Sequence, residues 1–109
     1  MKRGDIAIVV VSGELGKPRP AVVVQADELG DETTTVLVCP LSSDMQEASR
    51  LRPVFEPSTY NGLRVVSQAM ADKITPLRRD RIRQLIGSLN DAERDRLDRT
   101  LLIVLGLAR

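Results

Sequence analysis

Arg19 is the residue of this chain whose setting most favours chemistry on a phosphate. It follows Lys17 and lies between Pro18 and Pro20. Each proline fixes its own φ angle and restricts the residue before it, so the backbone on both sides of the arginine is stiff. A guanidinium held at a fixed point is well suited to binding phosphate oxygens. The segment therefore predicts an anion site, although a proline-rich turn with a solvated arginine has the same local pattern.

Composition excludes several other kinds of chemistry. The chain has no histidine, which removes a histidine general base, a two-histidine ribonuclease mechanism and a histidine-ligated zinc site. Cys39 is the only cysteine, so no intramolecular disulfide can form and a cysteine-based metal site is not expected. Phe55 and Tyr60 are the only aromatic residues, too few for gripping single strands chiefly by base stacking. The net charge of +1 means that an anion site must come from local placement of charge.

Length and hydropathy predict one cytoplasmic domain over residues 1–109. The 42% hydrophobic and 28% charged residues are ordinary for a globular protein. The start, Met1-Lys2-Arg3-Gly4-Asp5, lacks the apolar segment of a signal peptide. No stretch approaches the ~18 apolar residues of a membrane span. We therefore expect no membrane contact.

The apolar and β-branched runs predict a small antiparallel β structure. Residues 5–11, nearly all apolar, predict a strand that is buried on both faces or lies where two sheets join. Residues 12–16 contain two glycines and predict a loop. Pro40 predicts an edge or a bend at the end of the third strand, and Pro76 predicts an interruption after a long fifth strand. The other expected strands are residues 20–25, 34–41, 51–56, 65–74 and 83–89. Residues 81–89 could be strand throughout or a short helical turn followed by strand.

The last segment predicts an amphipathic helix. Asn90 is a candidate N-cap with Glu93 three residues later, the pattern of a capping box. Gly106 falls where a helix stop is expected. Together with the strands, this helix predicts a mainly β fold, a small and strongly bent antiparallel sheet or barrel with the C-terminal helix packed on it. Apolar residues follow helical spacing at Leu97, Leu101, Val104 and Leu105.

A set of motifs runs through nearly the whole chain in a fixed order. They are Lys2-Arg3-Gly4-Asp5-Ile6, Lys17-Pro18-Arg19-Pro20-Ala21-Val22-Val23-Val24-Gln25, Val36-Leu37-Val38-Cys39-Pro40-Leu41-Ser42-Ser43, Asn61-Gly62-Leu63, Ser67-Gln68-Ala69-Met70-Ala71-Asp72-Lys73-Ile74, Ile86-Gly87-Ser88-Leu89 and Val104-Leu105-Gly106-Leu107. In this order and spacing, the chain resembles the MazF/PemK family of toxin endoribonucleases. Many members have Gln at the position of Lys73 and Arg at that of Thr75. The absence of histidine fits the MazF-like branch better than the PemK-like arrangement.

The resemblance implies the SH3-like barrel of the CcdB/PemK-like toxin fold, assembled as a homodimer. It implies the toxin of a type II toxin–antitoxin system, which inhibits growth by cleaving single-stranded mRNA at short sequence motifs. Cleavage would be metal-independent and need no cofactor. The ribose 2′-hydroxyl attacks its own phosphate and leaves a 2′,3′-cyclic phosphate and a 5′-hydroxyl. A cognate MazE/PemI-like antitoxin would cover the RNA groove.

The resemblance also assigns the expected catalytic residues. Arg19 matches the arginine that contacts the scissile phosphate, where it would stabilise charge on the phosphorane. Ser42 matches the Thr or Ser at the end of the third strand and could donate a hydrogen bond to the same oxygens. Alternatively, the Ser42 hydroxyl caps its own backbone. The residues expected to bind substrate or support the site are Lys17, Ser43, Asp72 and Lys73.

The proton transfers are harder to assign. Arginine has a pKa above 12 and is a poor base at neutral pH. Asp72 matches an Asp or Glu of the family after the fifth strand and could act as a base if burial raised its pKa. The interpretation we favour is an ion pair in which Asp72 holds Arg19 or Lys73 in place.

Two other functions stay open at this point. A CcdB-like gyrase poison would share the fold, but those proteins resemble one another in a tail carrying a tryptophan, and this chain has none. A non-catalytic SH3-like nucleic-acid-binding module would use Arg19 and Ser42 to bind a phosphate without cleaving it. A basic run either follows RNA or an acidic antitoxin tail, or is a solvated face; it comprises Arg78, Arg79, Arg81 and Arg83.

Overall fold

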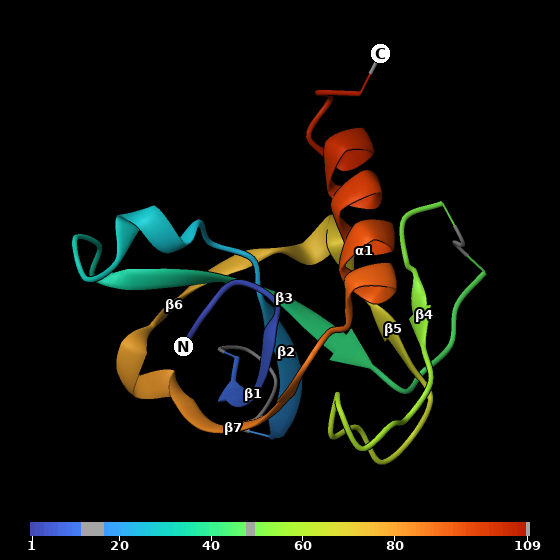
Figure 1. Ribbon diagram of the computed structural model, residues 1–109, viewed down its shortest axis with the longest axis horizontal. Helices are drawn as coiled ribbons and strands as arrows, with labels where there is room; N and C mark the ends of the chain where they lie inside the picture. Colours follow the sequence, from blue (N-terminus) through green and yellow to red (C-terminus); the bar gives the residue numbers. More distant parts are fainter. Residues whose placement is uncertain (12–16, 48–49, 109) are drawn as a thin grey trace.

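The computed structural model describes residues 1–11, 17–47 and 50–108, and within them seven strands form a bent antiparallel sheet that carries one α-helix (Figure 1). The predicted loop at residues 12–16 lies outside the described residues. The predicted mainly β fold with a C-terminal helix is confirmed. The strands and the helix are β1 (Asp5–Val10), β2 (Pro18–Val23), β3 (Thr35–Ser42), β4 (Val54–Phe55), β5 (Ser67–Ala69), β6 (Thr75–Arg78), β7 (Ile82–Ser88) and α1 (Asp91–Val104).

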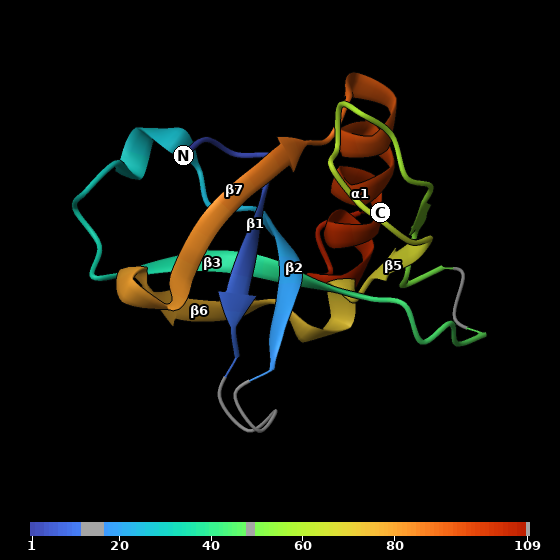
Figure 2. The same cartoon turned by 90° about the horizontal axis from the view of Figure 1, so that it is seen from below.

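Strand β3 is the centre of the sheet. The strand order is β4-β5-β3-β2-β1-β7, with β6 also pairing with β3. β3 pairs with β6 from Thr35 to Val38 and with β5 at Leu41 and Ser42. Figure 2 shows β1, β2 and β7 running across β3 and β6, so the sheet is strongly bent. Pro40 lies where β3 changes partner from β6 to β5, which agrees with the predicted bend, although the strand continues to Ser42.

Both faces of β1, of β3 and of the second half of β2 are largely buried, which explains their nearly continuous apolar sequences. Ile6 and Val22 belong to the cluster that includes Leu97 and Leu101 of α1. Alternate residues face opposite sides of a strand. The other face accordingly packs a second cluster, made of Ala7, Val9, Ala21, Val23, Val36, Val38 and Leu77.

Two strand predictions are wrong in their boundaries. The expected strand at 65–74 is reduced to Ser67–Ala69, after which the chain forms a 3-10 turn at Ala71–Lys73. The expected interruption around Pro76 is strand β6. Within the described residues β6 pairs with β3 alone, and such an edge strand tolerates a proline because its outer N–H groups need no ladder partner.

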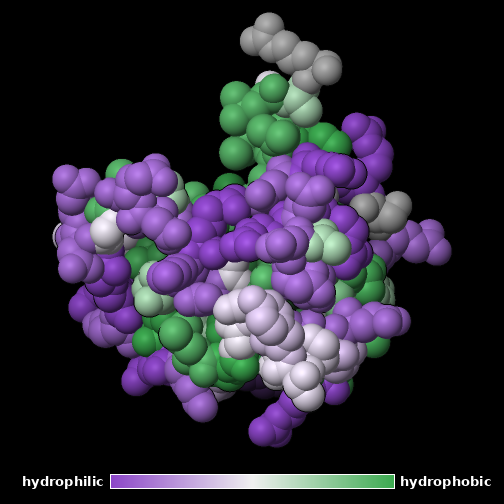
Figure 3. Space-filling view, viewed as in Figure 1, coloured by the Kyte–Doolittle hydropathy of each residue, from purple (hydrophilic) through white to green (hydrophobic). Residues whose placement is uncertain are grey.

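Helix α1 begins and ends as the sequence predicts. Asn90 Oδ1 accepts the Glu93 backbone N–H at 2.8 Å, and Glu93 Oε1 accepts the Asn90 N–H at 3.0 Å, a complete capping box. Gly106 follows the helix with φ +73°. None of the helices in the described ranges is long and apolar enough to cross a membrane. The far end of α1 carries an exposed apolar surface, seen at the top of Figure 3, made of Leu102, Ile103, Leu105 and Leu107.

A buried asparagine ties the turn before β5 to this helix. Asn61 is fully buried, and its Nδ2 donates to Glu56 O at 2.8 Å and to Glu93 Oε2 at 3.1 Å. Its Oδ1 accepts the N–H groups of Ser58 and Leu63 at 3.0 and 2.9 Å. Four hydrogen bonds leave this amide fully satisfied in the interior. The capping box of α1 and the turn thus share one carboxylate.

Candidate functional site

A groove of about 340 Å³ lies where the start of β2 approaches the end of β3. It collects four of the six residues predicted for the site and leaves out Asp72 and Lys73. Its charged side chains are two cations and one carboxylate. The lining residues are Lys17, Pro18, Arg19, Pro20, Leu41, Ser42, Ser43, Asp44, Val65 and Ser67.

The groove exists because β2 and β3 pair over only part of their length. Their register runs from Val23↔Val38 to Ala21↔Pro40. Beyond that point β2 stays on β1, with Arg19 opposite Val9, while the end of β3 turns to β5. Arg19 therefore lies inside a strand, and not on a turn before it as the proline-rich sequence also allowed. The strand holds its backbone in a fixed place beside the groove.

Ser42 is the last residue of β3, as predicted. Its Oγ accepts the backbone N–H of Asp44 at 3.0 Å, so the hydroxyl does cap its own backbone. A hydroxyl has one donor proton as well as two acceptor lone pairs. Within the described residues no hydrogen bond uses that proton. The two roles considered for Ser42 are therefore compatible, since the bond from Asp44 uses an acceptor position of the hydroxyl and not its proton.

Asp72 forms the predicted ion pair, but its partner is Arg52 and not Arg19 or Lys73. Arg52 Nε lies 3.2 Å from Asp72 Oδ1 and Arg52 Nη2 lies 3.3 Å from Oδ2. The guanidinium is buried, at 5% exposure. Burial alone would raise the pKa of Asp72, but the hydrogen bonds from Arg52 and from its own backbone, with the charges of Arg52 and Lys73, outweigh it and lower that pKa. A lowered pKa does not suit a general base.

This ion pair predicts a pH-dependent contribution to stability. Because the folded pKa of Asp72 lies below the ordinary value of 3.8, the contribution is present above that value and is lost as pH falls through the folded pKa. Replacing Asp72 by asparagine should lower the free energy of unfolding at pH 7 by about 1–2 kcal/mol, since Arg52 loses its partner. Urea denaturation from pH 7 to pH 3 should show the gap between the two proteins closing below pH 4.

The matched control is Asp95→Asn. Asp95 pairs with Arg99 at 3.1 Å on the exposed face of α1, where both side chains are more than half exposed. An exposed pair contributes little, so this change should stay within about 0.5 kcal/mol. A gap for Asp72→Asn that is equally large at pH 3 and pH 7 would contradict the ion-pair interpretation.

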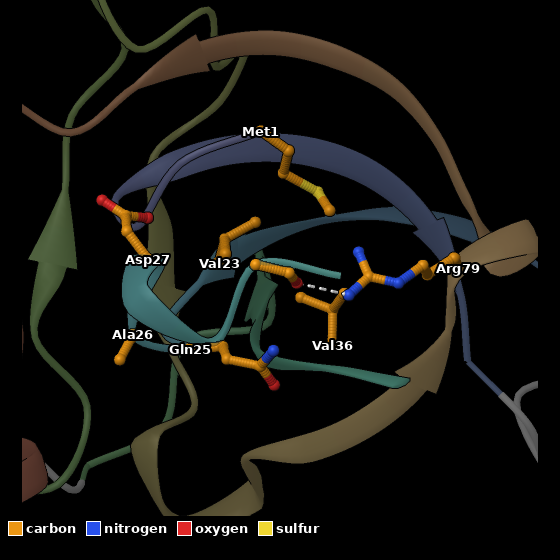
Figure 4. Close-up of a pocket in the computed structure, with 8 residues that line it drawn as sticks. Met1, Val23, Gln25, Ala26, Asp27, Val36 and Arg79 are labelled. Carbon is orange, nitrogen blue, oxygen red and sulfur yellow. Dashed lines mark hydrogen bonds between the residues drawn. The ribbon is translucent and has the colours of Figure 1, made fainter. Parts of the chain in front are cut away.

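Arg79 of the basic run is a structural residue. Its side chain lines a small cavity of about 40 Å³, and Figure 4 shows it pointing toward the connection that follows β2. Arg79 Nη2 donates to Gly30 O at 2.8 Å and to Thr33 O at 3.1 Å, which fastens the connection between β2 and β3. Arg78 pairs with Asp80 at 2.9 Å. The predicted contact of this run with RNA stays a prediction, and neutralising Arg79 would damage this connection as well as remove charge.

The groove lined by Lys17 and Arg19 differs in charge from two other grooves of the molecule. A groove of about 570 Å³ at the start of α1 is lined by the carboxylates of Glu56 and Glu93, and its Arg96 donates to Val54 O at 2.8 Å. A groove of about 370 Å³ beside the end of α1 is mostly aliphatic, apart from Arg3 and Asp98, which pair at 2.8 Å. A phosphate is favoured where cations face the groove, which selects the one with Lys17 and Arg19.

Six of the lining residues were not predicted for the site, and three of them, Asp44, Val65 and Ser67, lie outside the two motifs that contain the predicted ones. Asp44 directly follows the Ser42-Ser43 pair, and this spacing was the available signal for it. Val65 and Ser67 come from a segment more than twenty residues away, which only the β3–β5 pairing brings to the groove. Arg52 was also missed, because no local pattern links it to Asp72, twenty residues later.

Comparisons with known proteins agree with the fold and the sequence motifs. The family of PemK-like, MazF-like toxins of type II toxin–antitoxin systems matches residues 2–105. A "Probable endoribonuclease MazF" from Mycolicibacterium smegmatis is 38% identical over 109 residues, which is 99% of each chain.

Two solved structures share the fold. An endoribonuclease in complex with its cognate antitoxin, from Mycobacterial species, has a TM-score of 0.83 at 20% identity and covers 100% of this chain and 98% of its own. A MazE–MazF structure from Deinococcus radiodurans has a TM-score of 0.77 at 17% identity, with 99% and 98% coverage. Because the family match spans nearly the whole sequence and the relative is similar from end to end, this chain belongs to the PemK-like, MazF-like toxins of type II toxin–antitoxin systems.

Proposed function

We propose that this toxin is a sequence-specific, metal-independent endoribonuclease that cleaves single-stranded mRNA in the groove beside Arg19. The observation that carries the proposal is the convergence of Arg19 from β2 and Ser42 from β3 on one groove that also contains Lys17. The M. smegmatis relative, named as a probable endoribonuclease, supports the same activity. Family membership favours it over gyrase poisoning.

The proposed reaction is an in-line attack within one nucleotide. The 2′-oxygen loses its proton and forms a bond to phosphorus while the bond from phosphorus to the 5′-oxygen breaks and that oxygen gains a proton. The products are a 2′,3′-cyclic phosphate and a 5′-hydroxyl. The guanidinium of Arg19 binds the non-bridging oxygens as their negative charge grows. The hydroxyl of Ser42 donates a hydrogen bond to the same oxygens.

The remaining groove residues bind and align the RNA. Lys17 offers a second cation at the groove, suited to a neighbouring phosphate. Asp72 lies outside the groove with a lowered pKa, so no proton transfer is assigned to it. Holding the 2′-oxygen in line with the leaving oxygen supplies much of the rate in this scheme.

The proposed partners are a second copy of the chain and a MazE/PemI-like antitoxin. The solved endoribonuclease of Mycobacterial species is in complex with its cognate antitoxin, and a Deinococcus radiodurans structure contains MazE with MazF. The exposed apolar end of α1 favours contact with another protein surface. The activity would operate in the cytoplasm, where mRNA is translated.

The test is cleavage of a long single-stranded RNA in EDTA, with the new 5′ ends mapped. Discrete cuts with 5′-hydroxyl ends are expected. The matched substrate carries one 2′-deoxynucleotide at a mapped cut and should be intact at that site only, because the attacking oxygen is missing. RNA that is bound but stays intact would support the non-catalytic alternative, and cleaved DNA in the presence of gyrase would support gyrase poisoning.

Ser42 provides a graded test of the same site. Replacing Ser42 by alanine should lower kcat by about ten- to a hundredfold, the effect of losing one hydrogen bond to a charged oxygen. Ser42→Thr keeps the hydroxyl and should stay within about threefold of wild type. Single-turnover cleavage of a short RNA with the mapped motif gives both values. Equal rates for the alanine and threonine variants would remove Ser42 from the mechanism.

A further inference from the structure

One carboxylate lies in a groove that otherwise suits an anion. Asp44 lines the groove together with Lys17 and Arg19, and its side chain is exposed. In the part of the chain that the structure describes, Asp44 forms no ion pair with either cation. A carboxylate repels a phosphate at close range. Asp44 therefore faces a different part of any nucleotide that binds here, one that offers hydrogen-bond donors.

The backbone of Asp44 is held on both sides. Its own N–H donates to Ser42 Oγ at 3.0 Å. Two residues later, the Gln46 N–H donates to Gln68 Oε1 at 3.0 Å, and Gln68 Nε2 donates to Gln46 O at 2.7 Å. Gln68 is in β5, opposite Ser42, and only 3% exposed. Both anchors belong to the sheet, so the Asp44 carboxylate is presented at a defined place.

The groove also has an apolar wall on which a nucleobase can pack. Pro18 and Pro20 border it from β2 and are at least partly exposed. Val65 adds an aliphatic side chain that is 55% exposed. Single-stranded RNA is read by packing an unstacked base on such a surface and by hydrogen bonds to its Watson–Crick edge. Asp44 is the acidic group available for that edge among the lining residues.

We propose that Asp44 is a specificity-determining residue, which selects a nucleobase with an amino group over uracil next to the bound phosphate. This inference rests on the proposed ribonuclease function. An ionised carboxylate only accepts hydrogen bonds. Guanine presents two adjacent donors on its Watson–Crick edge, and adenine and cytosine each present an amino group. Uracil presents one N–H between two carbonyl oxygens, which repel a carboxylate.

The test is a binding selection that does not depend on cleavage. Wild-type protein and Asp44→Asn are each incubated with a random single-stranded RNA library that is 2′-O-methylated, and the bound RNAs are sequenced. Wild type should favour amino-bearing bases over uracil by about fivefold or more at one position. Asp44→Asn should lose or reverse that preference there, since an amide can both donate to and accept from uracil. Glu28→Gln, an equal charge change on an exposed residue outside the groove, should leave the profile unchanged.

The outcomes separate this inference from the function on which it rests. Identical base profiles for wild type and Asp44→Asn would overturn the role of Asp44, even if RNA is cleaved as proposed. A change spread evenly over all positions would also overturn it, because that is an effect of net charge. A changed preference at one position with no cleavage of ordinary RNA would support the role of Asp44 and contradict the nuclease. No binding of the library would contradict both.

Discussion

Replacing Arg19 by alanine should lower kcat/KM for RNA cleavage by about a hundredfold or more, the largest loss expected from one side chain in the groove. In the proposed mechanism, its guanidinium is the cation that meets the growing negative charge on the phosphorane. Its backbone is held in β2 opposite Val9. Water that fills the space left by alanine cannot supply an equivalent oriented charge. Single-turnover cleavage of a short RNA with the mapped motif measures the loss.

Two further variants separate geometry from charge. Arg19→Lys keeps the positive charge but loses the planar pair of donors, so its rate should fall between those of wild type and Arg19→Ala. Arg99→Ala removes one charge from an exposed position of α1 outside the groove and outside the basic run, and should change the rate by less than about threefold. An Arg19→Ala protein that is folded and cleaves within threefold of wild type would refute the proposed site.

Gly62→Ala should be the most destabilising small substitution, with a loss of about 3 kcal/mol or more in the free energy of unfolding. Gly62 has φ +71°, a conformation that strains other residues by about 1–3 kcal/mol. A methyl group here would also overlap the backbone carbonyl of Ile86 in β7. That contact is backbone against backbone, so no side-chain rotation relieves it. Urea denaturation of both proteins gives the difference.

Gly106→Ala is the matched control. It has nearly the same φ, +73°, but a methyl group there would meet no atom of the described chain within 4 Å. Its cost should be about 1 kcal/mol, from the backbone alone. Gly87→Ala tests the same packing from the side of β7, because its methyl group would overlap the carbonyls of Tyr60 and Asn61 in the turn. Equal losses at Gly62 and Gly106 would show that the packing against β7 contributes nothing.

The parts of the fold that local sequence determines were predictable. Helix α1 begins at the predicted cap because Asn90 and Glu93 satisfy each other within one turn. The apolar runs of β1 and β3 are strands because both of their faces are buried. Strand β6 was not predictable in the same way, because Pro76 reads as an interruption unless the strand is known to lie at an edge. The predicted strand at 65–74 shows the reverse error, since an alternating pattern continues past the point where the chain turns.

The residues of the candidate site show the same difference between what local sequence determines and what only folding brings together. Arg19 and Ser42 could be singled out from motifs, because each motif is continuous in the sequence. The partner of Asp72 could not, since Arg52 is paired with it by folding and not by spacing. Asp44 is a similar case. Its proposed role depends on Lys17 and Arg19, which line the same groove only because β2 and β3 separate there.

The two prolines beside Arg19 also determine what cannot enter the groove. In the β1–β2 ladder Pro20 lies opposite Ile8 and Pro18 opposite Val10, positions at which a residue need not donate to β1. Residues at such positions point their backbone N–H and C=O groups away from β1, toward the edge of β2 that borders the groove. Because proline has no N–H, Pro18 and Pro20 present only carbonyl oxygens at this edge. A polypeptide strand that paired with this edge would receive no hydrogen bonds from the two prolines and could therefore form only part of a β ladder. The edge is thereby protected against β-sheet extension and aggregation, and it stays accessible to ligands that bring their own donors.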